Sequence, residues 1–143
     1  MKKYILSAVV TVALGSAAIV TAEEAKTAPA AGASPVKLEM RLLNDAFKNL
    51  IDSLILNTPE TIEEPFHEVH KAKTNTEAAL EKGEIKLPKN GDKMKQFVEL
   101  DEQFHKKLGI LIEASRKKDM KTVQETTHKL LNGCVQCHSK FRN

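Results

Sequence analysis

Apolar residues recur along this chain at spacings of three and four, the pattern of helices that bury one face. The first such stretch follows Ser34 and Pro35, a pair typical of a helix start because serine caps the helix and proline fits its first turn. The pattern predicts a helix over residues 35–57. Its inward face is expected to carry Met40, Leu43, Phe47, Leu50 and Leu54.

A second helix is predicted from Thr58-Pro59, which repeats the start signal, to Gly83, which ends it. Pro65 falls in its first turns, where we expect a kink at the start of the helix. The apolar stripe of this helix is weaker than that of the first one. It consists of Ile62, Phe66, Val69, Lys73, Thr76 and Leu80.

The rest of the chain predicts a loop and two further helices. Glycine, proline and asparagine mark residues 83–91 as the loop, and Asp92 and Asp119 are the expected helix caps. The inward face of the third helix comprises Met94, Phe97, Val98, Phe104, Leu108 and Leu111. That of the fourth comprises Val123, Thr127, Leu130, Cys134, His138 and Phe141.

No segment alternates with the period of two that marks a strand, so the predicted fold class is all-α. Four amphipathic helices of similar length with short connections favour an antiparallel up-down-up-down four-helix bundle, with helices crossing at about 20°.

The amino-terminal region has a different composition from the helical region. A basic start at Lys2 and Lys3, an apolar run over residues 4–20 and small residues up to Ala22 predict a signal peptide, residues 1–22. The apolar run, about 17 residues long, is at the lower limit for a membrane span, so an uncleaved anchor is the alternative. Residues 23–34, rich in alanine and proline, predict a flexible linker, which leaves residues 35–143 as one domain. Export would place the cysteines in an oxidising compartment, the periplasm.

Both cysteines of the chain, Cys134 and Cys137, belong to a Cys-x-x-Cys-His sequence that ends at His138. On a helix the three side chains project from one side, so two thiols can add to the vinyl groups of a haem while the imidazole ligates the iron. Three alternatives fit less well. A redox dithiol of the thioredoxin kind lies in a βαβ unit, and the sequence predicts no strand. A disulfide within one helical turn would stabilise the fold little, and a zinc site would need a fourth ligand. The motif therefore predicts one covalently attached haem c.

The expected topology also indicates the second axial ligand of the iron. In an up-down-up-down bundle the start of the first helix lies beside the end of the last one. Met40, about five residues into its helix, would stand at nearly the level of His138, which makes it the predicted sixth ligand. Met94 begins the third helix at the same end and is the rival, whereas Met120 lies at the wrong end. Ordinary core packing is the alternative for each methionine.

Four other histidines lie at the far end of the predicted bundle or near the middle of a helix, where partly solvated or hydrogen-bonded histidines are common. At most they would bind a surface metal ion. They are His67, His70, His105 and His128.

A single Cys-x-x-Cys-His on the last of four helices resembles the class II cytochromes c, the cytochrome c prime superfamily, over about residues 35–142. The segments LEMRLLNDAFK, MKQF and HSKFR are also similar to parts of the periplasmic b-type bundle cytochrome, a relative without covalent links. This resemblance implies that Met40 and His138 bind the iron and that Met94 does not. The chain lacks the Arg-Gln pair common on the first helix of cytochrome c prime, which points toward the low-spin members rather than the gas-binding ones.

If both axial positions are filled, no substrate can reach the iron, and one-electron transfer is the chemistry that remains. We therefore expect an electron carrier rather than an enzyme, with a potential raised by the methionine ligand. One alternative is a cytochrome in which NO or CO displaces Met40. The other is a haemless helical export protein with an incidental motif.

The partners can be predicted from charge alone. The formal net charge of +3 falls to +1 once Lys2 and Lys3 leave with the signal peptide, which is no nucleic-acid footprint. Arg142 is the first candidate for a contact with a haem propionate, and other basic residues at the same end could steer an acidic redox partner. Ordinary solvation is their default explanation. No membrane span would remain after cleavage of the signal peptide. The sequence also allows a homodimer. The basic residues are Lys37, Arg41, Lys86, Lys89, Lys93, Lys95, Lys140 and Arg142.

Overall fold

The computed structural model describes residues 34–142, so the predicted signal peptide and nearly all of the predicted linker lie outside the described residues. Within that range the chain forms four α-helices and no strand, which confirms the all-α fold class. No helix of the described part has the length and apolarity needed to cross a bilayer. The helices are α1 (Pro35–Leu56), α2 (Glu63–Glu81), α3 (Met94–Arg116) and α4 (Met120–Phe141).

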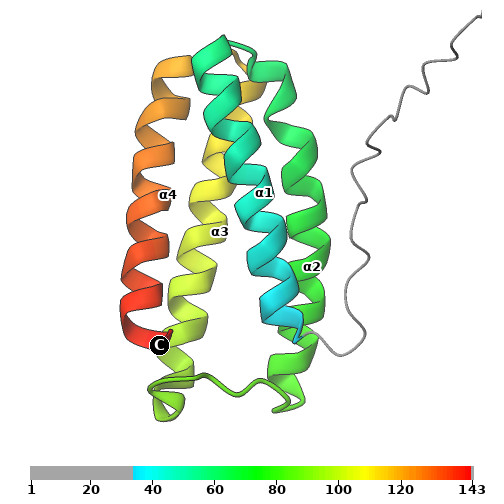
Figure 1. Cartoon of the computed structure of the whole chain (residues 1–143), viewed down its shortest axis with the longest axis vertical. Coiled ribbons are helices and arrows are strands. Elements are labelled where there is room, and N and C mark those ends of the chain that lie inside the picture. The colour runs from blue at the N-terminus through cyan, green and yellow to red at the C-terminus, as the bar shows by residue number, and fades with distance from the viewer. Residues whose placement is uncertain (1–33, 143) are drawn as a thin grey trace, which may run out of the picture.

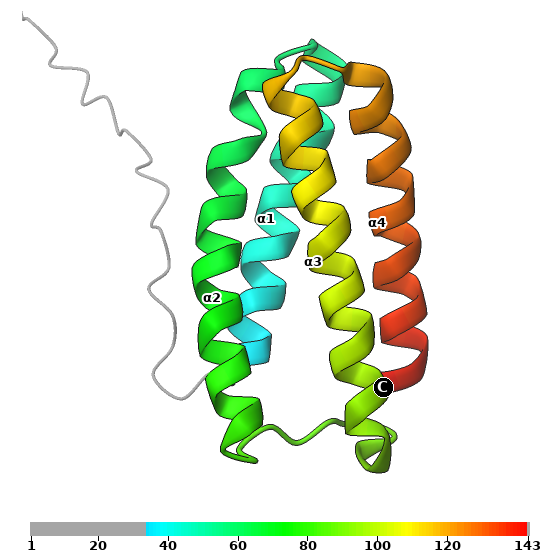
Figure 2. The same cartoon turned by 180° about the vertical axis from the view of Figure 1, so that it is seen from behind.

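The four helices lie side by side with their long axes roughly parallel (Figure 1). The amino end of α1, the α2–α3 connection and the carboxyl end of α4 lie together at what we call the terminal end. The α1–α2 and α3–α4 connections lie at the opposite, distal end, as the reverse view also shows (Figure 2). Helix α1 packs along α2, and α3 packs along α4, with much less contact between the two pairs.

All four helices contribute apolar side chains to the hydrophobic core toward the distal end. Leu50 of α1, Leu111 of α3 and Val123 of α4 are completely buried, and Phe66 of α2 is 1% exposed. Phe47 packs edge-on against Phe66, with ring centroids 5.9 Å apart. Burial of this many large apolar groups is the main source of stability in such a bundle.

Local sequence signals mark two of the helix starts, one by a side-chain cap and one by a proline. Asp119 caps α4 as predicted, since its carboxylate accepts a hydrogen bond from the backbone N–H of Thr122 at 3.1 Å. Pro35 occupies the first turn of α1 as predicted, although Ser34 makes no side-chain cap. These positions depend only on neighbouring residues, which is why the sequence identifies them.

The start of α3 corrects the prediction for Asp92. A 3₁₀ turn, Gly91–Lys93, contains this residue, and α3 begins only at Met94 without a side-chain cap. Asn90 precedes the turn in the left-handed conformation with φ of 53°, and its side-chain amide donates to the carbonyl oxygen of Lys140, 2.6 Å away. A tertiary contact to the end of α4 thus accompanies this start.

The start of α2 also differs from the prediction. Pro59 begins a separate 3₁₀ turn, Pro59–Thr61, and α2 itself starts at Glu63. Pro65 is therefore in the first turn of α2, where a missing N–H costs no helical hydrogen bond. The chain changes direction before Pro65, so the proline has no interior helical bond to break.

Candidate functional site

The Cys-x-x-Cys-His residues lie near the carboxyl end of α4, at the terminal end of the bundle. Cys134, Cys137 and His138 are all partly buried, whereas Val135 and Gln136 between them are exposed. Their spacing places the three reactive side chains on one side of the helix, the side that also carries the buried Leu130 and Phe141. The structure therefore presents both thiols and the imidazole from the inward side of α4.

Contacts around Phe141 hold this end of α4 in place. The ring of Phe141 packs edge-on against Phe97 of α3, with centroids 5.5 Å apart. The backbone N–H of Arg142 donates to the carbonyl oxygen of His138 at 3.0 Å. Together with the Asn90 hydrogen bond described above, these contacts fix the last turn of α4 against α3 and the α2–α3 connection.

Burial shifts the pKa values of the three reactive groups in directions that bear on their chemistry. Burial raises the pKa of the Cys134 thiol, and burial together with the Asp101 carboxylate raises the pKa of Cys137. Reactive dithiols instead have lowered thiol pKa values, so the environment does not match a thiolate nucleophile. Burial and the nearby Arg142 lower the pKa of His138, which favours the neutral imidazole that binds metals.

Met40 lies in the second turn of α1, which also belongs to the terminal end. It is partly buried and packs against the hydrophobic core. Helices α1 and α4 are not among the closely packed helix pairs of the described chain. Two helices that ligate a porphyrin from opposite sides cannot be in close backbone contact, and α1 and α4 meet this condition.

The other methionines and histidines predicted as alternatives lie elsewhere. Met94 is the first residue of α3 and is partly buried, while Met120 packs against the core at the distal end. His67 pairs with Glu63 in the first turns of α2, its Nε2 atom 3.1 Å from the Glu63 Oε1 atom. The structure joins none of these to the Cys-x-x-Cys-His residues. His70 and His128 are exposed.

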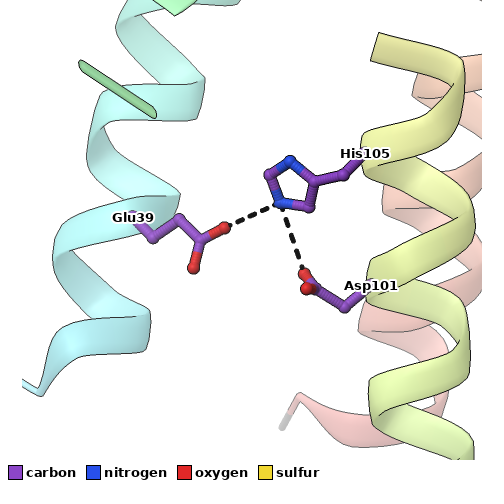
Figure 3. Close-up of side chains that lie close together, drawn as sticks. All are labelled: Glu39, Asp101 and His105. Carbon is purple, nitrogen blue, oxygen red and sulfur yellow. Dashed lines mark hydrogen bonds and ion pairs between the residues drawn. The ribbon is translucent and has the colours of Figure 1, made fainter. Parts of the chain in front are cut away.

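The structure also reveals a buried cluster that the sequence did not predict (Figure 3). Glu39 of α1 is 1% exposed, and its Oε1 atom lies 2.9 Å from Nε2 of His105 on α3. The same nitrogen is 3.7 Å from Oδ1 of Asp101, one turn earlier on α3. Burial, with the Glu39 charge adding to it and His105 opposing it, raises the pKa of Asp101 to about 6.

Two sequence signals could have indicated this cluster. Asp101 and His105 are four residues apart, which places them on one face of a helix. Glu39 precedes Met40 and follows the same spacing as the buried Leu43 and Ala46. Leu43 and Leu50 of the predicted inward face are buried, and its other three residues are partly buried against the core. His105 is hydrogen-bonded, one of the two states expected for it from the sequence, but its side chain is only 11% exposed and is therefore not at the surface.

The basic residues predicted to surround the terminal end are exposed, apart from the half-buried Lys140. The α2–α3 connection, which carries three of them, does lie at this end (Figure 1). Arg142 is exposed, and none of the eight pairs with a carboxylate within residues 34–142. Their charges are therefore available to a partner or a ligand.

Comparison with known proteins identifies no relative: no protein-family model, curated protein or solved structure matches the chain. The function must therefore be inferred from the residues and their placement.

Proposed function

We propose that this chain is an exported monohaem c-type cytochrome that carries single electrons, built as an antiparallel up-down-up-down four-helix bundle. The observation that carries the proposal is the Cys-x-x-Cys-His sequence on the inward, half-buried side of α4. The amino end of α1 and the carboxyl end of α4 lie at the same end of the molecule, which supports the antiparallel arrangement (Figure 1). The basic, apolar and small residues of positions 1–22 support export to the periplasm.

Four side chains would hold the cofactor. The S–H groups of Cys134 and Cys137 would each add across one vinyl C=C bond, with a C–S bond formed at one carbon and the hydrogen placed on the other. This addition needs no external oxidant. His138 would bind the iron from α4, and Met40 would bind it from α1.

When bound, the haem supplies a one-electron couple between the ferric and ferrous states. His138 and Met40 would fill both axial positions and so exclude substrates and gases from the metal. The thioether of Met40 would raise the potential relative to a second nitrogen ligand. The apolar packing around α1 and α4 would limit water access and thereby tune that potential further.

The exposed lysines and arginines of the terminal end would guide an acidic redox partner to this surface. Long-range attraction between opposite charges accelerates association and weakens as salt screens it. Arg142 is four residues after the proposed iron ligand His138 and is the first candidate for a contact with a haem propionate. We propose no nucleic-acid partner. Sedimentation of the full chain tests the alternative that two copies associate as a homodimer.

Covalent attachment is tested by expressing the full chain with a cytochrome c maturation system and staining a denaturing gel for haem. We expect one stained band at the position of the protein. The double variant Cys134→Ala/Cys137→Ala should lose the stain entirely, while His128→Ala, an exposed histidine on the same helix, should keep it. A colourless wild-type chain would contradict the proposal and favour the haemless export protein.

The role of Met40 is tested by optical spectra of the haem-loaded protein. We expect a thioether-to-iron charge-transfer band in the oxidised form that disappears in Met40→Ala. The matched control is Met94→Ala, a partly buried methionine at the same end that should leave the band intact. A high-spin wild-type spectrum with ready CO binding would instead support the gas-binding alternative.

A further inference from the structure

The Glu39 carboxylate is buried with only one of its two oxygens satisfied. Oε1 contacts His105, but Oε2 has no hydrogen-bond partner among the residues that the structure describes. The only other such side-chain atom in this range is the neutral hydroxyl oxygen of Thr76. A buried carboxylate oxygen without a protein partner loses its hydration, and a bound cation would compensate that loss.

The surrounding side chains have the chemistry and spacing of a metal site. One ligand atom each of Glu39, Asp101 and His105 lies within 4.8 Å of the others. Figure 3 shows the Glu39 carboxylate extending from α1 toward α3, where the imidazole and the Asp101 carboxylate face it. Two carboxylates and one imidazole form a mixed oxygen and nitrogen donor set, which suits divalent first-row transition ions.

One member of the cluster, His105, borders a groove that opens to solvent. An open groove between α2 and α3 is lined by His105 and by Lys73 and Glu77 of α2. Lys73 forms an ion pair with Glu77, and both side chains act electrostatically on Asp101. The groove thus brings solvent to His105 and adds a further carboxylate, that of Glu77, at its edge.

We propose that Glu39, Asp101 and His105 bind one divalent transition-metal ion, with zinc as the probe, in addition to any haem iron. Two carboxylate oxygens and one imidazole nitrogen would supply three ligands, and a water molecule entering from the groove would complete a tetrahedral site. The donors come from α1 and α3, so the ion would connect the two helix pairs at the terminal end. None of the four residues proposed to hold the haem takes part, and the inference does not depend on that proposal.

The test is a zinc titration of the full chain, followed by equilibrium dialysis and elemental analysis. We expect one zinc ion per chain. Glu39→Gln and His105→Ala should each weaken its binding by about tenfold or more, since each removes a ligand. The control variants are His70→Ala, an exposed histidine lining the same groove, and His128→Ala on α4, and both should bind zinc like the wild type.

A second measurement separates ligation from folding. Zinc should raise the Tm of the wild type progressively with its concentration, because the ion binds only the folded state, and should not raise that of Glu39→Gln. Glutamine has the shape of glutamate, so this variant should fold and give a Tm in chelator. Absence of zinc binding, or binding that Glu39→Gln leaves intact or His70→Ala abolishes, overturns the proposal. The haem content, measured on the same samples, reports independently on the cytochrome proposal.

Discussion

The two ends of the bundle are built from different kinds of side chain. At the distal end Leu50, Ile62 and Val123 are completely buried and surround a core without ionisable groups among its central residues. At the terminal end the interior contains the ionisable Glu39 and His105, besides the half-buried residues of the Cys-x-x-Cys-His sequence. The distal end therefore supplies stability, and the terminal end holds the groups that can do chemistry.

Helix α1 illustrates the difference because it contributes to both ends. Leu50 removes apolar surface from water and finds aliphatic neighbours, which is favourable without any special partner. Glu39 on the same face is equally buried, but its charge is stabilised only as far as His105 or a bound cation compensates it. Proteins commonly retain functional groups such as buried charges even though these lower the stability of the fold.

The largest effect on stability is expected at the distal end. Leu50→Ala should lower the free energy of unfolding by about 3 kcal/mol, because it removes a completely buried side chain and leaves a cavity. The matched control is Leu56→Ala on the same helix, whose side chain is 70% exposed and whose loss should cost less than about 0.5 kcal/mol. Urea denaturation gives both values. Equal losses in the two variants would show that the buried distal core does not supply the stability of the bundle.

An intermediate effect of opposite sign is expected at the terminal end. Because burial raises the pKa of Asp101 to about 6, the folded state binds its proton more tightly than the unfolded state does. The stability tied to this proton is present at low pH and is lost as the pH rises through about 6. Asp101→Asn should therefore stabilise the metal-free protein at pH 7.5, by about 1 kcal/mol, and much less at pH 4.5.

Thermal unfolding of Asp101→Asn in chelator at the two pH values checks this expectation. The control is Glu102→Gln, the neighbouring exposed carboxylate, which should show no comparable pH-dependent gain. A loss of stability in Asp101→Asn at pH 7.5 would mean that neighbouring groups fully compensate the buried carboxylate. The ionisable groups of the terminal end would then cost the fold no stability relative to the distal end.

The smallest effect is expected on the surface of the distal end. Arg116 donates from Nε to Oε2 of Glu63 at 2.8 Å and also contacts Oε1, and this pairing lowers the pKa of Glu63 to about 2. Its contribution to stability is present above the ordinary glutamate pKa of 4.5 and is lost as the pH falls toward about 2.

Glu63→Gln should consequently lower Tm slightly at pH 7, by an amount that shrinks with added salt and disappears near pH 2. Scanning calorimetry over this pH range gives the result. Glu125→Gln, an exposed carboxylate on α4, is the matched control and should show no such pH window. A deficit that persists at pH 2 would assign the effect to packing rather than to charge.

The fold was predictable where a local rule decides the structure. The spacing of apolar residues identified all four helices, and Pro35 and Asp119 marked two of their starts. Asp92 misled the prediction: it lies in a 3₁₀ turn before α3, next to Asn90, whose side chain donates a hydrogen bond to Lys140 across the terminal end. Periodicity placed Leu43 and Leu50 correctly on the buried face of α1 but gave no reason to bury Glu39.

By itself, the sequence determined the helices, the side of α4 that carries both thiols and the imidazole, and therefore the prediction of a covalently attached haem. Those features depend on residues no more than a few positions apart. Only the tertiary structure decided that Glu39, Asp101 and His105 meet, because Glu39 and His105 are 66 positions apart along the chain. Burial of a charge depends on what packs around it, and no spacing within one helix can specify the charges that another helix brings.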